Sequence, residues 1–133
     1  MIAGIGVDII EVQRIKGAIE RHGDRFLNRI YCDLEIEYCR GGAQPYQSFA
    51  ARFAAKEAVL KSLGVGWQDG TRFTDIAVVM DAMGAPRISL SGKSLQISKR
   101  LGIRNIHISL SHTADYAVAQ AVAERGVDCA SPQ

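Results

Sequence analysis

One helix-forming segment carries several side chains of catalytic type. Residues 48–64 read SFAARFAAKEAVLKSLG, with Ser48 as a candidate N-cap and Gly64 as a candidate stop. Its apolar stripe and its alanines predict a central, buried helix. The segment also contains four charged residues, Arg52, Lys56, Glu57 and Lys61. Because burying such groups unpaired costs several kcal/mol, they either form ion pairs within the helix, as Glu57 and Lys61 would, or belong to a functional site.

Two polar side chains stand on segments that predict strands. Asp8 lies in residues 2–10, a short and mostly apolar run, and could instead cap the helix that follows. His112 ends the alternating segment 106–112, a position where most histidines are core residues with satisfied nitrogens. Neither residue indicates chemistry by itself.

The five candidates gain meaning if the two strands flank the long helix. One cleft would then hold Asp8, Glu57, Lys61, Arg52 and His112. Two carboxylates with open positions suit Mg²⁺, which keeps waters and completes its shell with substrate phosphates. They do not suit zinc, because no second histidine or thiolate is placed to help. The basic side chains would bind the remaining phosphate charge, so the residues predict a Mg²⁺-dependent phosphoryl-type site.

The elements that would position these residues predict an α+β fold: a long central helix packed on a small, mainly antiparallel sheet. After the first strand we expect helices over 11–22, 24–31 and 33–40, then the long helix. Strands over 73–80 and 87–90 follow, then a helix over 91–101 and strands over 106–112 and 116–123. Gly4 and Gly6 make an incomplete phosphate-loop fingerprint and more often indicate close packing. We expect one catalytic domain over 1–126 and a flexible tail over 127–133.

Composition limits the classes of protein. The 133 residues are 47% hydrophobic and 23% charged, which is typical of a globular domain. A net charge of +2 does not indicate nucleic-acid binding, and no stretch predicts a signal peptide or a membrane span. The three cysteines, Cys32, Cys39 and Cys129, match no metal or redox spacing, so a reducing cytoplasm is expected.

A basic patch interrupts this nearly neutral chain. Five cations occur between residues 14 and 29: Arg14, Lys16, Arg21, Arg25 and Arg29. A solvated helix face is the usual explanation of such a run. A docking surface for an acidic partner is the alternative, because opposite potentials steer encounter.

Three blocks of the sequence resemble a known family. They are GIGVDIIE at residues 4–11 with Arg14-Ile15, RFAAKEA at 52–58 with Lys61 and Gly64, and SLSH at 109–112. In this order and spacing they closely resemble the holo-acyl-carrier-protein synthases, the short class of 4′-phosphopantetheinyl transferases. The resemblance runs from residue 2 to about residue 124. It implies transfer of 4′-phosphopantetheine from coenzyme A to a carrier-protein serine for fatty-acid biosynthesis, with release of adenosine 3′,5′-bisphosphate.

The resemblance also implies roles for individual residues. Asp8 and Glu57 match the Mg²⁺ ligands, and Lys61 matches a pyrophosphate contact. Glu57, Lys61 and His112 are the expected catalytic group. The expected coenzyme A contacts are Arg52, Lys61, Gly64, Ser111 and His112, with Gly84 and Pro86 from a neighbouring subunit. Arg52 resembles a contact to the ribose 3′-phosphate, and Lys56 is interpreted as orienting the acidic ligands through a salt bridge. The proton acceptor stays open between a metal-bound water and Glu57.

Assembly and partner follow from the same resemblance. It implies a homotrimer with active sites at subunit interfaces, and docking of an acidic acyl carrier protein on Arg14, Arg21 and Arg25. Some members have lysine where Ala85 stands, so one charged contact is absent here.

Three other functions compete with this one. The first is a Mg²⁺-dependent pyrophosphate hydrolase, which needs no basic docking helix. The second is a non-catalytic module that binds coenzyme A or a nucleotide. The third, a nucleic-acid-binding protein, is disfavoured by the small net charge and by the lack of aromatic stacking sites.

Overall fold

The computed structural model describes residues 1–126, so the predicted tail over 127–133 and Cys129 lie outside the described residues. The first half contains β1 (Ile2–Glu11), α1 (Val12–His22), α2 (Asp24–Ile30), α3 (Asp33–Gly41) and α4 (Pro45–Leu63). Short 3-10 turns at Trp67–Asp69 and Phe73–Asp75 lead into β2 (Ile76–Met80), β3 (Pro86–Leu90), α5 (Gly92–Arg100), β4 (Ile103–His112) and β5 (Tyr116–Arg125). The predicted α+β class is confirmed.

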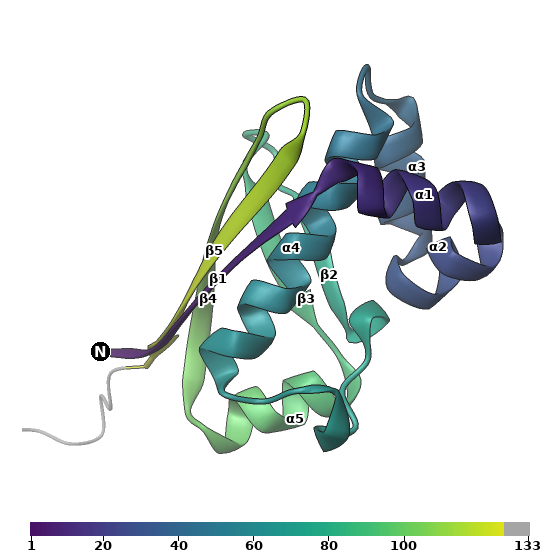
Figure 1. Ribbon diagram of the computed structural model, residues 1–133. Helices are drawn as coiled ribbons and strands as arrows, with labels where there is room; N and C mark the ends of the chain where they lie inside the picture. Colours follow the sequence, from purple (N-terminus) through teal and green to yellow (C-terminus); the bar gives the residue numbers. More distant parts are fainter. Residues whose placement is uncertain (127–133) are drawn as a thin grey trace, which may run out of the picture.

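The strands form two antiparallel sheets. The larger sheet has the order β1-β5-β4, and β2 pairs with β3 in a hairpin. In the larger sheet, Asp8 on β1 lies opposite Ala119 on β5, and His112 on β4 lies opposite Ala117 on β5. Helix α4 lies between the larger sheet and the hairpin, while α1, α2 and α3 gather near one end of α4 (Figure 1).

Strand β1 and helix α4 approach each other at backbone distance. A Cβ added to Gly4 would lie 1.9 Å from the carbonyl oxygen of Ser62, and one added to Gly6 would lie 1.9 Å from that of Ala58. No side chain fits in this space, so the two glycines serve close packing rather than phosphate binding. The contact fixes the strand that carries Asp8 against the helix that carries Glu57.

The bounds of α4 differ from the sequence prediction at one end. The helix begins at Pro45, with Gln44 as N-cap, so the assignment of Ser48 as N-cap is wrong. Proline is favoured in the first helical turn because the missing N–H has no helical acceptor there. The predicted stop is confirmed, since Gly64 has a φ of 71° in the left-handed region.

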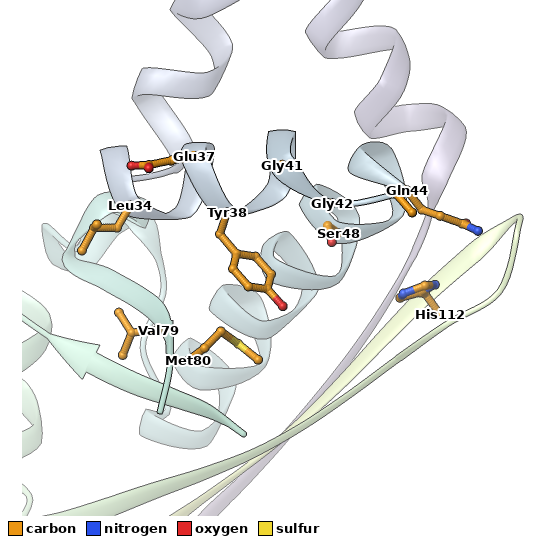
Figure 2. A pocket seen from close by; sticks show the side chains of 11 residues that line it. Leu34, Glu37, Tyr38, Gly41, Gly42, Gln44, Ser48, Val79, Met80 and His112 are labelled. Atoms are coloured by element: carbon orange, nitrogen blue, oxygen red, sulfur yellow. The ribbon is translucent and has the colours of Figure 1, made fainter. Parts of the chain in front are cut away.

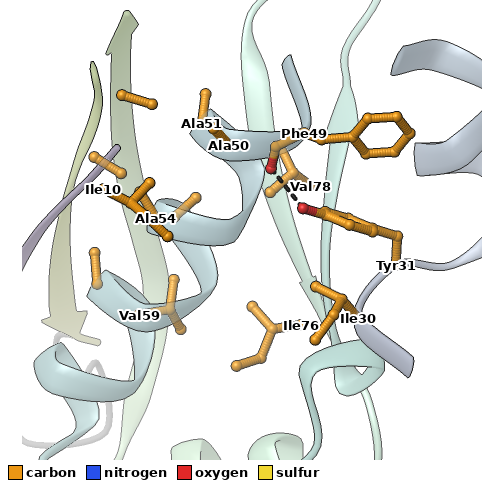
Figure 3. Packing of buried hydrophobic residues seen from close by; sticks show 14 of the residues in the cluster. Ile10, Ile30, Tyr31, Phe49, Ala50, Ala51, Ala54, Val59, Ile76 and Val78 are labelled. Atoms are coloured by element: carbon orange, nitrogen blue, oxygen red, sulfur yellow. Dashed lines mark hydrogen bonds between the residues drawn. The ribbon is translucent and has the colours of Figure 1, made fainter. Parts of the chain in front are cut away.

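The core surrounds α4 and extends to α2, α3 and β2. Alanines on α4 and β5 let the helix lie close to the sheet. On the other side, the Tyr31 hydroxyl donates a hydrogen bond of 2.6 Å to the carbonyl of Phe49, with the two rings in contact (Figure 3). Within residues 1–126, no helix combines the length and the apolar character that a membrane crossing needs.

Candidate functional site

A cleft of about 720 Å³ opens between the end of β1, α1 and the middle of α4. Asp8 enters it from β1 and Glu57 from α4, so the two predicted metal ligands lie together. The remaining lining includes the apolar residues Ile9, Ile10, Ile15, Phe26 and Phe53. The cleft therefore places the two carboxylates in a lining that mixes apolar and polar residues.

Lys61 closes one side of the carboxylate pair. Its Nζ lies 3.2 Å from Oδ1 of Asp8 and donates to the carbonyl of Val7 at 2.9 Å. Asp8 therefore pairs with Lys61, and no side chain caps the start of α1. Burial raises the pKa of Glu57, and the negative charge of Asp8 raises it further, while Lys61 lowers it.

This electrostatic imbalance fits a bound cation. Two carboxylates repel each other across the cleft, and the single ammonium of Lys61 is bonded to only one of them. Among residues 1–126 there is no group of three histidine, cysteine or acidic side chains that could enclose a metal ion. The two carboxylates of Asp8 and Glu57 are donors that suit a hard ion such as Mg²⁺, which retains waters and accepts substrate oxygens.

Two arginines of the basic patch face the same cleft. Arg14 and Arg21 line it from α1, next to Gln13. Arg25 lies elsewhere, in a small pocket with His22 and Arg29. Arg14 and Arg21 thus bring positive charge to the cleft that holds the two carboxylates.

His112 lines a second pocket. This pocket lies between α3, the start of α4, the end of β2 and the end of β4, and its lining includes Tyr38, Ser48 and Met80. Figure 2 shows Tyr38 pointing from α3 toward Met80, with His112 on the far side of the pocket. Within one chain, therefore, His112 and the Asp8–Glu57 pair do not share a cleft.

Arg52 is associated with the second pocket rather than with the first. The side chain is buried, its guanidinium lies 4.3 Å from the centre of the Tyr38 ring, and Nη2 donates to the sulfur of Met80 at 3.6 Å. Tyr38 and Met80 both line the pocket that contains His112. Sequence reasoning missed both residues, because an exposed tyrosine on a short helix carries no motif.

The interpretation of Lys56 is wrong. Its ammonium is completely buried and pairs with Glu35 at 2.8 Å, and it also donates to the carbonyls of Phe73 and Ile76. The second oxygen of Glu35 accepts the amide of Val78 at 3.0 Å. Lys56 therefore joins α3, α4 and β2 and does not orient Asp8 or Glu57.

The other expected contacts lie at the surface. Ser111 is exposed near the end of β4, and Gly64 is exposed at the end of α4. Gly84, with a φ of 81°, lies in the β2–β3 turn, and Pro86 begins β3. The carboxylate of Asp81 accepts the amides of Met83 and Ala85 and so holds this turn in place.

Comparisons with known proteins agree with the resemblance carried by the three motifs. The model of the 4′-phosphopantetheinyl transferase superfamily matches residues 4–121. A holo-[acyl-carrier-protein] synthase of Koribacter versatilis is 48% identical over 124 residues, which cover 93% of this chain and 99% of that protein.

Solved structures show the same likeness. The crystal structure of a holo-[acyl-carrier-protein] synthase from Neisseria meningitidis matches with a TM-score of 0.85 and 33% identity, covering 94% of this chain and 100% of that one. The Helicobacter pylori enzyme in complex with coenzyme A matches with a TM-score of 0.79 and 33% identity, covering 90% and 99%. The chain therefore belongs to the holo-[acyl-carrier-protein] synthases of the 4′-phosphopantetheinyl transferase superfamily.

Proposed function

We propose that this chain transfers 4′-phosphopantetheine from coenzyme A to a serine of an acyl carrier protein for fatty-acid biosynthesis. The observation that carries the proposal is the Asp8–Glu57 pair, which faces a cleft bordered by Arg14 and Arg21. The carboxylates would hold the Mg²⁺ that binds the phosphates of coenzyme A, and the arginines would attract an acidic carrier protein. Free Cys32 and Cys39 thiols agree with a reducing cytoplasm as the site of action.

The residues of the cleft divide the work of the reaction. Asp8 and Glu57 would hold Mg²⁺, which when bound supplies Lewis-acid neutralisation of the pyrophosphate charge. Lys61, already fixed by Asp8 and Val7, would donate to a pyrophosphate oxygen. The carrier serine would attack the β-phosphorus, and the bond to the departing adenosine 3′,5′-bisphosphate would break. The serine proton would leave to Glu57 or to a water of the cleft.

The complete site requires a second copy of the chain. Asp8 and Glu57 lie in one cleft, whereas Arg52 and His112 lie at another pocket. The outer face of β1 exposes Ile5, Val7 and Ile9, an apolar row that a neighbouring subunit would cover. We take the assembly to be the homotrimer that the family resemblance implies, with Gly84 and Pro86 contributed across the interface.

Intact mass of an apo acyl carrier protein tests the function directly. After incubation with this protein, coenzyme A and Mg²⁺, the carrier is expected to gain about 340 Da, one phosphopantetheine arm. A chelator should abolish the gain. Coenzyme A cleaved without a gain in mass would indicate the pyrophosphate hydrolase, and coenzyme A bound without reaction would indicate the non-catalytic module.

A further inference from the structure

Arg52 is a buried cation without a carboxylate partner in the described part of the chain. The residue is 4% exposed, and its Nε has no hydrogen-bond partner among residues 1–126. Nη2 donates to the Met80 thioether at 3.6 Å. The guanidinium also forms a hydrogen bond with the side chain of Cys39. Because sulfur is a weak acceptor, the guanidinium keeps one unpaired donor and has no oxygen acceptor among residues 1–126.

The charges near Arg52 do not balance. Lys56 is close enough for the two cations to disfavour each other, and the pKa of Lys56 is lowered first by burial and in part by Arg52. Glu35 is the carboxylate of this cluster, and it is already bonded to Lys56 and to the amide of Val78. Two buried cations therefore share one anion. Since an uncompensated buried charge is unfavourable, the arrangement calls for an external anion at Arg52.

Tyr38 fixes the orientation of this cation. The ring centre lies 4.3 Å from Cζ of Arg52, which is a stacking contact of guanidinium on an aromatic face. Tyr38 itself is 50% exposed and lines the pocket with Met80, Ser48 and His112. A contact of this kind restrains the position of the guanidinium without using any of its N–H donors.

We infer that Tyr38 is a positioning residue that holds Arg52 for the 3′-phosphate of coenzyme A, with the Met80 sulfur occupying the acceptor position until that phosphate arrives. The inference rests on the proposed function. Coenzyme A carries two anionic groups, a pyrophosphate and a phosphate monoester. The Asp8–Glu57–Lys61 cleft suits the pyrophosphate, which leaves the monoester for the unpaired arginine.

Two variants of Tyr38 separate its ring from its hydroxyl. Tyr38→Leu removes the aromatic face, and Tyr38→Phe keeps it as the matched control. For Tyr38→Leu we expect the KM for coenzyme A to rise about fivefold, the loss of one cation–π contact, with kcat unchanged within about twofold. The KM for 3′-dephospho-coenzyme A should stay at the wild-type value, and Tyr38→Phe should match wild type with both substrates.

The inference is tested by comparing the effect of Tyr38→Leu on the KM for coenzyme A with its effect on the KM for 3′-dephospho-coenzyme A. An equal rise in KM for both would show that Tyr38 only supports the fold, and an unchanged KM for coenzyme A would show that it does not position Arg52. A wild-type protein that uses both substrates equally would also overturn the inference while leaving the transferase intact. If the wild type transfers nothing, calorimetric binding of adenosine 3′,5′-bisphosphate against adenosine 5′-phosphate still tests Tyr38, because the affinity difference should shrink in Tyr38→Leu.

Discussion

Lys56 and Glu57 are neighbours on α4, yet they meet opposite environments. Lys56 is sealed between α3 and β2, with Glu35 and two backbone carbonyls as partners. Glu57 is half-buried at the open cleft. There it faces the negative charge of Asp8, which raises the pKa of Glu57. One helix thus carries a charge whose partners are supplied by the fold and a charge whose carboxylate has no ion-pair partner among residues 1–126.

The difference distinguishes structural charges from reactive ones. A buried ion pair with its hydrogen bonds made is costly to break, because removing one partner leaves the other charge buried and unpaired. Two neighbouring carboxylates with too few hydrogen-bond donors repel each other. A bound metal ion or a substrate can relieve this repulsion. Sequence position alone does not separate the two, since Lys56 and Glu57 belong to the same motif.

The largest effect is expected from Glu57→Gln. The amide keeps the volume of the side chain but not its charge, so transfer to the carrier protein should fall by at least about a thousandfold, the equivalent of several kcal/mol of metal-assisted charge stabilisation. Thermal stability should be unchanged or slightly higher, because the repulsion from Asp8 is removed. Glu20→Gln, which removes an exposed carboxylate of α1, is the control. Activity near the wild-type level in Glu57→Gln would refute the metal-ligand role.

Lys56→Met should act on stability instead. It leaves Glu35 buried without its cation, so the free energy of unfolding should fall by about 3–5 kcal/mol, measured by urea denaturation. Lys99→Met, at an exposed position of α5, should change little. Adding Glu35→Gln to Lys56→Met should recover part of the loss, because the two residues are coupled. A small effect of Lys56→Met would mean that the pair is not structural.

Charge reversal at Arg14 and Arg21, the proposed docking surface for acyl carrier protein, should affect only one of the two substrates. Reversing both Arg14 and Arg21 to Glu should raise the KM for acyl carrier protein about tenfold or more, while the KM for coenzyme A changes less than about twofold. Arg100→Glu, on α5, provides a matched charge reversal away from the cleft. Equal effects on the two substrates would be incompatible with a docking face.

The smallest effect is the pH dependence caused by Glu57. Its pKa is raised in the folded chain, so the folded state holds this proton to higher pH than the unfolded chain, in which glutamate titrates near about 4.3. Without metal, the stability that protonated Glu57 contributes is full below that value and is lost as pH rises through the folded pKa. Compared with Glu57→Gln, wild type in chelator should therefore lose urea resistance as the pH rises above about 4.3, and Mg²⁺ should restore it. Parallel curves for the two proteins would contradict this assignment.

The sequence could predict the features that depend on a single contact, that of strand β1 with helix α4. The sequence predicts one site for Asp8 and Glu57, and the structure brings them to one cleft. The close packing favoured for Gly4 and Gly6 is confirmed as well. These features are readable because carboxylates on apolar elements and glycines in strands are locally unusual.

Features that depend on the placement of several elements could not be predicted. Glu35 lies 21 positions from Lys56 and arrives through α3, so the helix alone suggested no partner for the lysine. Tyr38 meets Arg52 by the same route. The sequence predicts Ser48 as the N-cap of α4 because serine is a favoured cap residue, whereas the helix begins at Pro45, a residue that also suits a first turn.

Because Gly4 and Gly6 have no side chains, the backbone of β1 lies directly against the backbone of α4. The separation of Asp8 from Glu57 is set by backbone resting on backbone, at Ser62 and Ala58. A single methyl group at either glycine would therefore push the strand away from the helix and move the reaction centre.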